Sequence, residues 1–147
     1  MPKSKKQSEK SVKPAKAKPQ PEKSMDAPTW IGFDVKDSGG DSWHVDCHVQ
    51  SSEGDNIILE VTADPENEEL APDGLCGEGY FDRDDFDDKP DQKAREKFII
   101  EQMDTALDIA RVGSLFDGNV AGYNALADKV HQWAIRLITE SFDLPKR

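Results

Sequence analysis

The chain has 147 residues, 35% of them hydrophobic, and a formal net charge of −11, and a length in this range predicts one domain. Its aliphatic runs are short, with Ile57-Ile58-Leu59 typical of the longest, whereas a membrane-spanning helix needs about 20 apolar residues. The basic N-terminus has no apolar stretch after it, which argues against a secretory signal. We therefore expect no membrane partner, and a location in the cytoplasm or within a particle assembled inside the cell.

Charge is distributed unevenly along the sequence. Residues 1–24 hold eight Lys and two Glu, a net of +6, whereas residues 25–147 hold 11 basic and 28 acidic residues, a net of −17. Like charges repel within each part, and each part attracts partners of the opposite sign. The sequence thus indicates a protein that acts by association.

Residues 1–24 predict a disordered tail, because lysines alternate there with prolines and Val12 is the only large aliphatic residue after Met1. Lysines spread along an extended backbone can neutralise phosphates without reading a base sequence. The alternatives are a solubilising extension, or a strand that folds back onto its own acidic body. The candidate polyanion-binding residues are Lys3, Lys5, Lys6, Lys10, Lys13, Lys16, Lys18 and Lys23.

Three runs show the period-two alternation of half-buried strands, over residues 29–36, 42–50 and 56–63. The links between them, residues 37–41 and 51–55, are rich in Gly, Ser and Asp and suit hairpin loops. These runs predict a three-stranded antiparallel meander with one face toward solvent.

The second of these runs places His44, Asp46 and His48 on one polar face. Their side chains would follow one another at about 6–7 Å, and imidazole and carboxylate suit a divalent transition metal. Because three ligands on one strand lie in a row, we favour a solvated face over a metal site. The cysteine of this strand, Cys47, would point to the opposite side. With Cys76 it is expected to be a free thiol, the alternative being a disulfide between the two.

Residues 64–90 show no convincing periodicity and are predicted to form a long acidic loop. From Asp64 to Asp91 there are twelve acidic residues, with only Arg83 and Lys89 as basic ones. The glycine-rich run 74–79 lacks the residues of a phosphate-binding loop and is interpreted as a flexible turn. A calcium loop starting at Asp85 fails because Pro90 replaces the glycine that its geometry requires.

Aromatic residues stand among carboxylates in the second half of this loop. Such segments dock on basic, partly apolar surfaces, although the aromatic rings can instead anchor the loop to its own core. The candidate docking residues are Tyr80, Phe81, Asp82, Asp84, Asp85, Phe86, Asp87 and Asp88.

Two long amphipathic helices are predicted, over residues 91–112 and 119–142. Apolar residues recur in both at spacings of three and four, Gly113 is a plausible stop for the first helix, and Asn119 can cap the second. The stripes are interpreted as core, with the seam of a homodimer as the alternative.

The predicted fold class is α+β: a three-stranded antiparallel meander, a long acidic loop and two long helices, preceded by a disordered tail. No nucleophile has an identifiable base beside it, so we expect no enzyme and no cofactor.

Three functions remain open. The first is an accessory protein of a larger assembly, of the viral-particle or ribonucleoprotein type. Its acidic domain would dock on a basic protein surface, and its basic arm would contact nucleic acid or an acidic subunit. The second is an acidic inhibitor or nucleic-acid mimic that occupies a basic cleft. The third is a metal-dependent enzyme.

Overall fold

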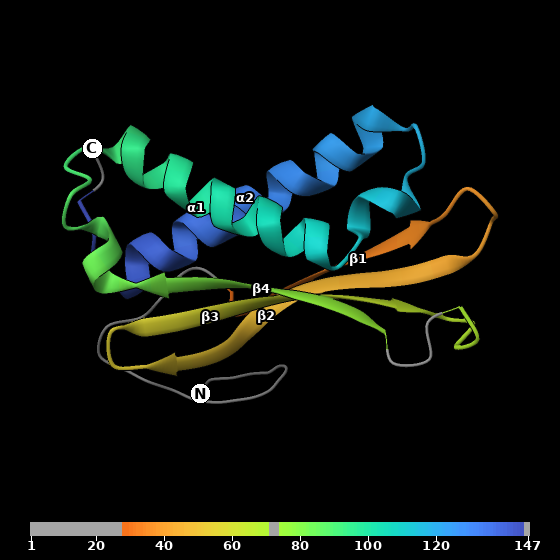
Figure 1. Cartoon of the computed structure of the whole chain (residues 1–147), viewed down its shortest axis with the longest axis horizontal. Coiled ribbons are helices and arrows are strands. Elements are labelled where there is room, and N and C mark those ends of the chain that lie inside the picture. The colour runs from red at the N-terminus through yellow and green to blue at the C-terminus, as the bar shows by residue number, and fades with distance from the viewer. Residues whose placement is uncertain (1–27, 71–73, 146–147) are drawn as a thin grey trace, which may run out of the picture.

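The computed structural model describes residues 28–70 and 74–145, so the tail lysines named above lie outside the described residues. One antiparallel sheet has the strand order β1-β2-β3-β4, and two helices cross each other on one of its faces (Figure 1). The fold class is therefore α+β. The elements are β1 (Trp30–Lys36), β2 (Ser42–Glu53), β3 (Asn56–Pro65), β4 (Leu75–Asp82), the 3₁₀ turn η1 (Arg83–Phe86), α1 (Gln92–Ile109), the 3₁₀ turn η2 (Val112–Leu115) and α2 (Val120–Ser141).

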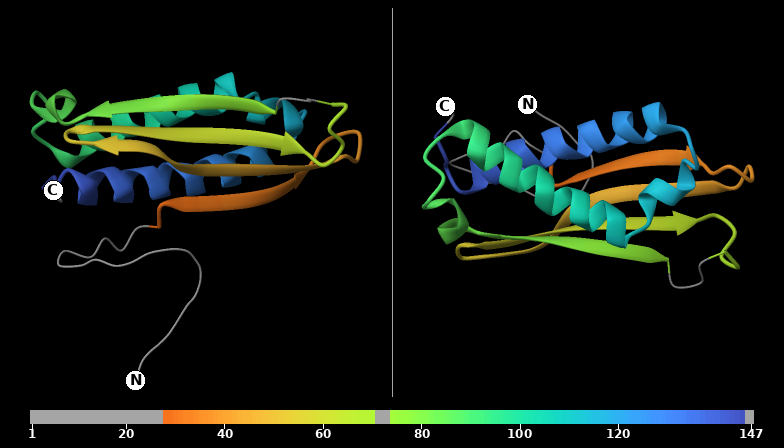
Figure 2. Two further views of the ribbon diagram at one scale, coloured as in Figure 1. Left: turned by 90° about the horizontal axis from the view of Figure 1, so that it is seen from below. Right: turned by 45° about the horizontal axis from the view of Figure 1, so that its top comes forward.

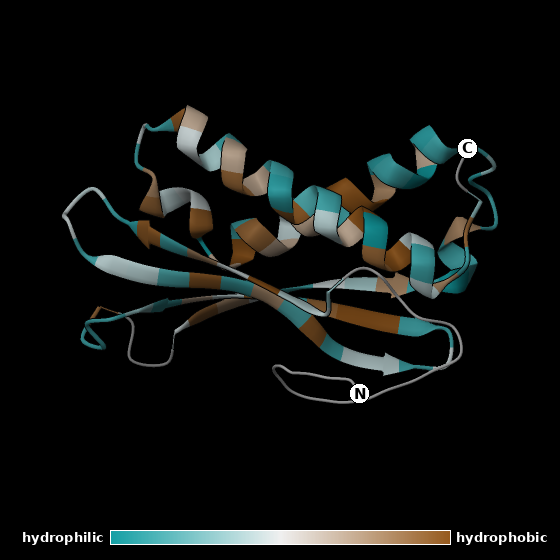
Figure 3. Cartoon of the chain, turned by 180° about the vertical axis from the view of Figure 1, so that it is seen from behind, coloured by the Kyte–Doolittle hydropathy of each residue, from teal (hydrophilic) through white to brown (hydrophobic). Residues whose placement is uncertain are grey.

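The first three strands confirm the predicted meander to within a few residues at each end. Buried and partly exposed positions alternate along β2 and β3, as the hydropathy pattern requires, and Figure 3 shows this alternation along the ribbon. Val45, Cys47, Leu59 and Val61 have no exposed surface and join one continuous core beneath the helices.

The fourth strand corrects two predictions, the acidic loop over 64–90 and the flexible turn over 74–79. Residues 75–82 pair with β3, and their side chains alternate between the two faces of the sheet. Gly77 and Gly79 occupy inner-face positions where a strand usually has aliphatic residues. For this reason no hydrophobic periodicity marks this strand. A Cβ atom at Gly77 would lie 2.1 Å from the carbonyl oxygen of Ala106, and one at Gly79 would lie 3.3 Å from Met103 Sδ. Glycine thus lets the backbone of α1 rest directly on β4.

The two helices are confirmed, and α1 is shorter than predicted. It begins after Asp91, whose side chain accepts a hydrogen bond from the Ala94 amide at 2.8 Å. It ends at Ile109 because Arg111 takes a left-handed backbone conformation, with φ of 58°, and the chain turns into η2. Asn119 caps α2, as predicted, by accepting a hydrogen bond from the Gly122 amide at 3.0 Å.

The apolar stripes of both helices are buried against the sheet and against each other. The large hydrophobic residues left mostly exposed on the described helices are Ile109, at the end of α1, and Val120, at the start of α2. The stripes invoked for a homodimer are therefore already used inside the chain, and that dimer stays a prediction. Neither described helix combines the length and the apolar character needed to cross a bilayer.

Gly77→Ala is expected to destabilise the fold by about 1–3 kcal/mol, because the added methyl group forces α1 away from β4. The measurement is urea unfolding followed by tryptophan fluorescence. The matched control is Gly39→Ala in the exposed hairpin, where an added Cβ meets nothing closer than 3.4 Å. Equal stability of the two variants would contradict the close packing of α1 on β4.

Candidate functional site

The sheet has one face that no described element covers, opposite the helices (Figure 2). We call it the open face. It carries five carboxylates, two histidines and one lysine, and exposed aromatic residues on both edge strands. Its residues are Trp30, Gly32, Asp34 and Lys36 of β1, Ser42, His44, Asp46 and His48 of β2, Ile58, Glu60, Thr62 and Asp64 of β3, and Cys76, Glu78 and Tyr80 of β4.

A chain of alternating carboxylates and imidazoles runs across the first three strands of this face. Strand pairing creates it, because β1 and β3 each place a carboxylate beside a histidine of β2. The separations are 3.1 Å from Asp34 Oδ1 to His44 Nδ1, 3.3 Å from His44 Nε2 to Asp46 Oδ2, 3.7 Å from Asp46 Oδ1 to His48 Nδ1, and 2.9 Å from His48 Nε2 to Glu60 Oε1.

Both nitrogens of each imidazole therefore face a carboxylate oxygen. A carboxylate can only accept hydrogen bonds, and a neutral imidazole has a single N–H to donate. Of these contacts, the one between His44 Nδ1 and Asp34 Oδ1 at 3.1 Å is a hydrogen bond. The central carboxylate, Asp46, also accepts a hydrogen bond from the Thr62 hydroxyl at 2.7 Å. This arrangement fixes the orientation of the polar side chains in the middle of the open face.

The structure confirms that His44, Asp46 and His48 share one face. Their imidazole nitrogens point at different carboxylates along the row and not toward a common point. In residues 28–70 and 74–145, no group of three or more His, Cys, Asp or Glu side chains is arranged to hold a metal ion. The metal-dependent enzyme thus has no ligand set in the described part of the chain.

Trp30 is the exposed aromatic residue at the β1 edge of the open face. Its ring lies over Gly32, where an added Cβ would be 2.5 Å from the indole, and it stacks on His44 with ring centroids 6.4 Å apart. Glycine at position 32 therefore makes room for the indole. About half of the surface of Trp30 (53%) stays exposed, so part of the indole is accessible to a partner.

Tyr80 is the corresponding aromatic residue at the β4 edge, with 57% of its surface exposed. Its hydroxyl donates a hydrogen bond to Glu78, and the Gln50 side chain reaches across β3 to the same carboxylate. The hydrogen bond to Glu78, and then the negative charge of Glu78, raise the pKa of Tyr80. The phenol therefore stays protonated and remains a hydrogen-bond donor at neutral pH.

The predicted docking segment is divided by the structure between core and surface. Phe81 and Phe86 are buried, with 2% and 6% of their surface exposed. Phe86 packs against Phe98 and Phe142, with ring centroids 5.4 and 5.9 Å apart. These contacts favour the alternative in which the phenylalanines anchor the segment, so Tyr80 is its only aromatic ring on the surface.

The acidic members of that segment form the turn η1 and its flanks. Asp82 accepts a hydrogen bond from the Asp84 amide at 2.9 Å, and Asp85 accepts one from the Asp82 amide at 3.0 Å, so these two carboxylates cap the turn. The Lys89 ammonium lies 3.0 Å from Asp88 and lowers the pKa of that carboxyl through its hydrogen bond and its charge. The exposed carboxylates of the segment are Asp84, Asp87 and Asp88.

Sequence reasoning missed Trp30, Asp34, Glu60 and Glu78 as members of the site. They come from strands far apart in sequence, and the register aligns Trp30 with His48, His48 with Glu60, and Glu60 with Glu78. One signal was available, since Glu60 stands at a polar position between buried residues of the third predicted strand. Only the order and register of the strands could show that Glu60 lies beside His48.

Comparison with known proteins supplies no relative from which a function can be transferred. No protein-family model matches the sequence, and neither the curated proteins nor the solved structures include a match. A functional assignment therefore depends on the geometry and charge of the described residues.

The two cysteines are free, as expected, and their environments differ: Cys47 is buried and Cys76 is exposed. Burial, and then the charge of Asp46, raise the pKa of Cys47 to about 12. At about pH 8 only about one Cys47 thiol in 10,000 is a thiolate, the form that reacts.

We expect iodoacetamide to label Cys76 alone in the native protein and both residues in urea, as measured by peptide mass spectrometry. Equal native labelling would contradict the placement of β2.

Proposed function

We propose that this protein is a non-enzymatic accessory protein of a larger assembly, which docks on a basic protein surface through the open face of its sheet. Its basic N-terminal tail contacts nucleic acid or an acidic subunit of the same assembly. The observation that carries the proposal is the open face itself, where the carboxylates lie between two exposed aromatic residues, Trp30 and Tyr80.

The charge balance of the described residues favours a basic partner. Residues 28–70 and 74–145 contain 26 Asp and Glu against nine Lys and Arg. Of those basic residues only Lys36 lies on the open face. A lysine or arginine of a partner can pair there with a carboxylate and also lie over an exposed aromatic ring. Exposed ion pairs contribute little one at a time, so we assign specificity to the combination with Trp30 and Tyr80.

The polar groups of the open face are better suited to binding than to covalent chemistry. Each imidazole is held between carboxylates, and Cys47, which stands between Asp46 and His48 in sequence, is buried on the opposite side of the sheet. A covalent mechanism needs a nucleophile within hydrogen-bond reach of its base. The histidines here contact carboxylates, which accept hydrogen bonds and have no proton for a base to remove.

An acidic inhibitor or nucleic-acid mimic is the second candidate, and the turn η1 favours it. Asp84, Asp87 and Asp88 are exposed in and directly after this turn, so several carboxylates are concentrated in one short segment. A mimic of this kind occupies the same cleft as nucleic acid, so nucleic acid displaces it from its partner. An accessory protein that docks beside a nucleic-acid site is not displaced.

Removing charge from the open face is expected to weaken docking selectively. The probe is a synthetic Arg- and Lys-rich peptide titrated into the full chain by isothermal calorimetry at low salt. We expect Glu60→Gln with Glu78→Gln to weaken binding by about tenfold, because each lost ion pair contributes up to about 1 kcal/mol. Trp30→Ala is expected to weaken it further without a change in charge.

The matched control removes two charges from the helical layer, Glu101→Gln in α1 with Asp128→Asn in α2, both at exposed positions. Its net charge equals that of the open-face double variant. If the two double variants lose equal affinity, binding follows net charge alone and the open face is not the docking site.

Deleting residues 1–24 is expected to abolish salt-sensitive binding of a labelled single-stranded RNA, because the tail carries eight of the lysines. Fluorescence anisotropy at several salt concentrations measures this binding. The truncated chain should still bind the basic peptide, since the open face is intact. Unchanged RNA affinity after truncation would show that the tail is not the polyanion-binding arm.

A further inference from the structure

The strand β1 lies at an edge of the sheet, and its hydrogen bonds define which of its backbone groups face outward. The Val49 amide donates to the Thr29 carbonyl at 3.1 Å, and the Asp37 amide donates to the Asp41 carbonyl at 2.9 Å. Hydrogen-bonded positions alternate along an antiparallel pair, so the odd-numbered residues of β1 turn their N–H and C=O groups toward β2. The outward groups belong to Trp30, Gly32, Asp34 and Lys36.

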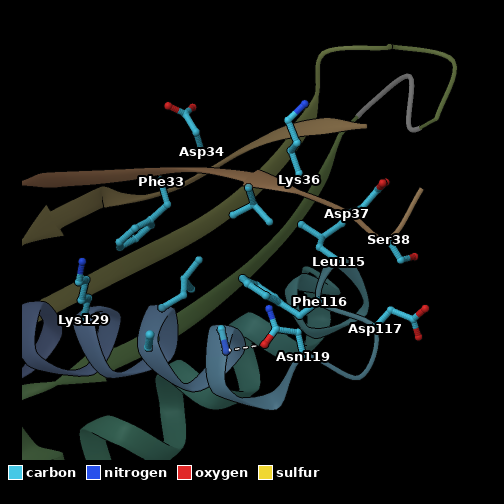
Figure 4. A pocket seen from close by; sticks show the side chains of 14 residues that line it. Phe33, Asp34, Lys36, Asp37, Ser38, Leu115, Phe116, Asp117, Asn119 and Lys129 are labelled. Carbon is cyan, nitrogen blue, oxygen red and sulfur yellow. Dashed lines mark hydrogen bonds between the residues drawn. The ribbon is translucent and has the colours of Figure 1, made fainter. Parts of the chain in front are cut away.

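A cleft of about 520 Å³ lies beside this edge, between β1 and the first half of α2. Phe33 extends from β1 toward α2, and Phe116 and Lys129 approach from the helical layer (Figure 4). The helix α1 rests directly on the glycines of β4, whereas the cleft separates α2 from β1. Among the described residues, the β1 edge is therefore uncovered along its outward backbone groups, and a cleft lies on its inner side.

We propose that β1 pairs with β1 of a second copy of this chain, antiparallel and centred on Phe33. In this register Trp30 lies opposite Lys36 of the second copy, and Gly32 lies opposite Asp34. All the outward N–H and C=O groups of both strands are then paired, as in a continuous antiparallel sheet. On the inner side the two Phe33 rings meet at the mouth of the clefts, and Ile31 lies opposite Val35.

The number of paired outward groups and the side-chain charges together favour this register. Centring the pair on Val35 would set Asp34 opposite Lys36 of the second copy, but it would place Gly32 and Trp30 opposite the hairpin turn and leave them outside the paired strands. Centring the pair on Asp34 would set two aspartates directly opposite each other, which is destabilising. Centring it on Gly32 would set Lys36 opposite Pro28, which lies outside the strand and has no N–H to donate. The register centred on Phe33 places Lys36 against the exposed ring of Trp30, a cation–π contact, and places Asp34 opposite a glycine. One repulsive pair remains, the two Asp34 carboxylates, on a diagonal of about 7–8 Å.

A second copy fits this edge better than the chain's own N-terminal tail does. The tail contains four prolines, which lack the amide hydrogen of a ladder, and Val12 is its only large aliphatic residue after Met1. It therefore cannot fill an apolar cleft with alternate side chains. A two-fold symmetric pair of β1 strands also leaves neither copy with an exposed β1 edge.

The dimer and the docking to a basic partner respond to salt in opposite directions. The described residues of each copy carry a net charge of −17, so the two copies repel each other and salt weakens this repulsion. Docking between opposite charges becomes weaker as salt is added. Failure of the dimer and failure of the proposed function are therefore separate outcomes.

The test is sedimentation equilibrium of the full chain at about 100 μM, at low salt and at about 0.5 M NaCl. We expect partial dimerisation that increases with salt. Asp34→Pro removes an outward N–H and blocks the edge, and it is expected to weaken the dimer at least about tenfold. The matched control Asp34→Asn keeps that N–H and removes the diagonal repulsion, so it is expected to strengthen the dimer by about two- to fivefold. Near-UV circular dichroism reports whether each variant keeps its fold.

A wild-type chain that stays monomeric under both conditions overturns the proposal, as does a folded Asp34→Pro variant that dimerises like the wild type. If the Asp34→Pro variant does not fold, disulfide crosslinking tests the same interface. In a Cys76→Ser background, Phe33→Cys places two thiols opposite each other on strands whose Cα atoms are about 4.5 Å apart, and these form a disulfide in air. Ser38→Cys, outside the paired strand, is expected to dimerise without forming a disulfide crosslink. Crosslinking of Ser38→Cys without Phe33→Cys also overturns the β1 interface.

Discussion

The backbone of α1 lies against Gly77 and Gly79 of β4, where any side chain would meet Ala106 or Met103. This contact draws α1 close to the middle of a strand whose two central inner positions have no side chain. Helices and sheet then enclose one continuous core, to which the other strands contribute their alternate residues. A single layer of helices leaves the second face of the sheet without a described cover, and that face is available for a partner.

The open face is lined by polar contacts between carboxylates and imidazoles. Carboxylates from β1 and β3 lie on either side of the β2 histidines, and Thr62 orients the central one, Asp46. The row is open to solvent, and carboxylates outnumber basic residues on this face as they do in the described residues as a whole. The exposed rings of Trp30 and Tyr80 add apolar surface at the two edges, a combination that suits a partner rich in arginine and lysine.

Much of this fold could be predicted from the sequence, because the meander and both helices have regular apolar patterns. β4 was missed for a physical reason: its two central inner positions are Gly77 and Gly79, which allow close packing because they lack a side chain and so leave no hydrophobic signal. The shared face of His44 and His48 followed from alternation within one strand. Their carboxylate partners did not, since Asp34 and Glu60 reach them only through the register of neighbouring strands.

The most direct test of the account is to map a basic ligand onto the sheet by NMR. Backbone amide shifts of the ¹⁵N-labelled chain, recorded as an Arg- and Lys-rich peptide is added, report which residues the peptide contacts. The account predicts that the largest changes fall on the open-face positions of β1 to β4, with Trp30, Glu60 and Tyr80 among them. Changes concentrated on the exposed surfaces of α1 and α2, with the sheet unaffected, would contradict it.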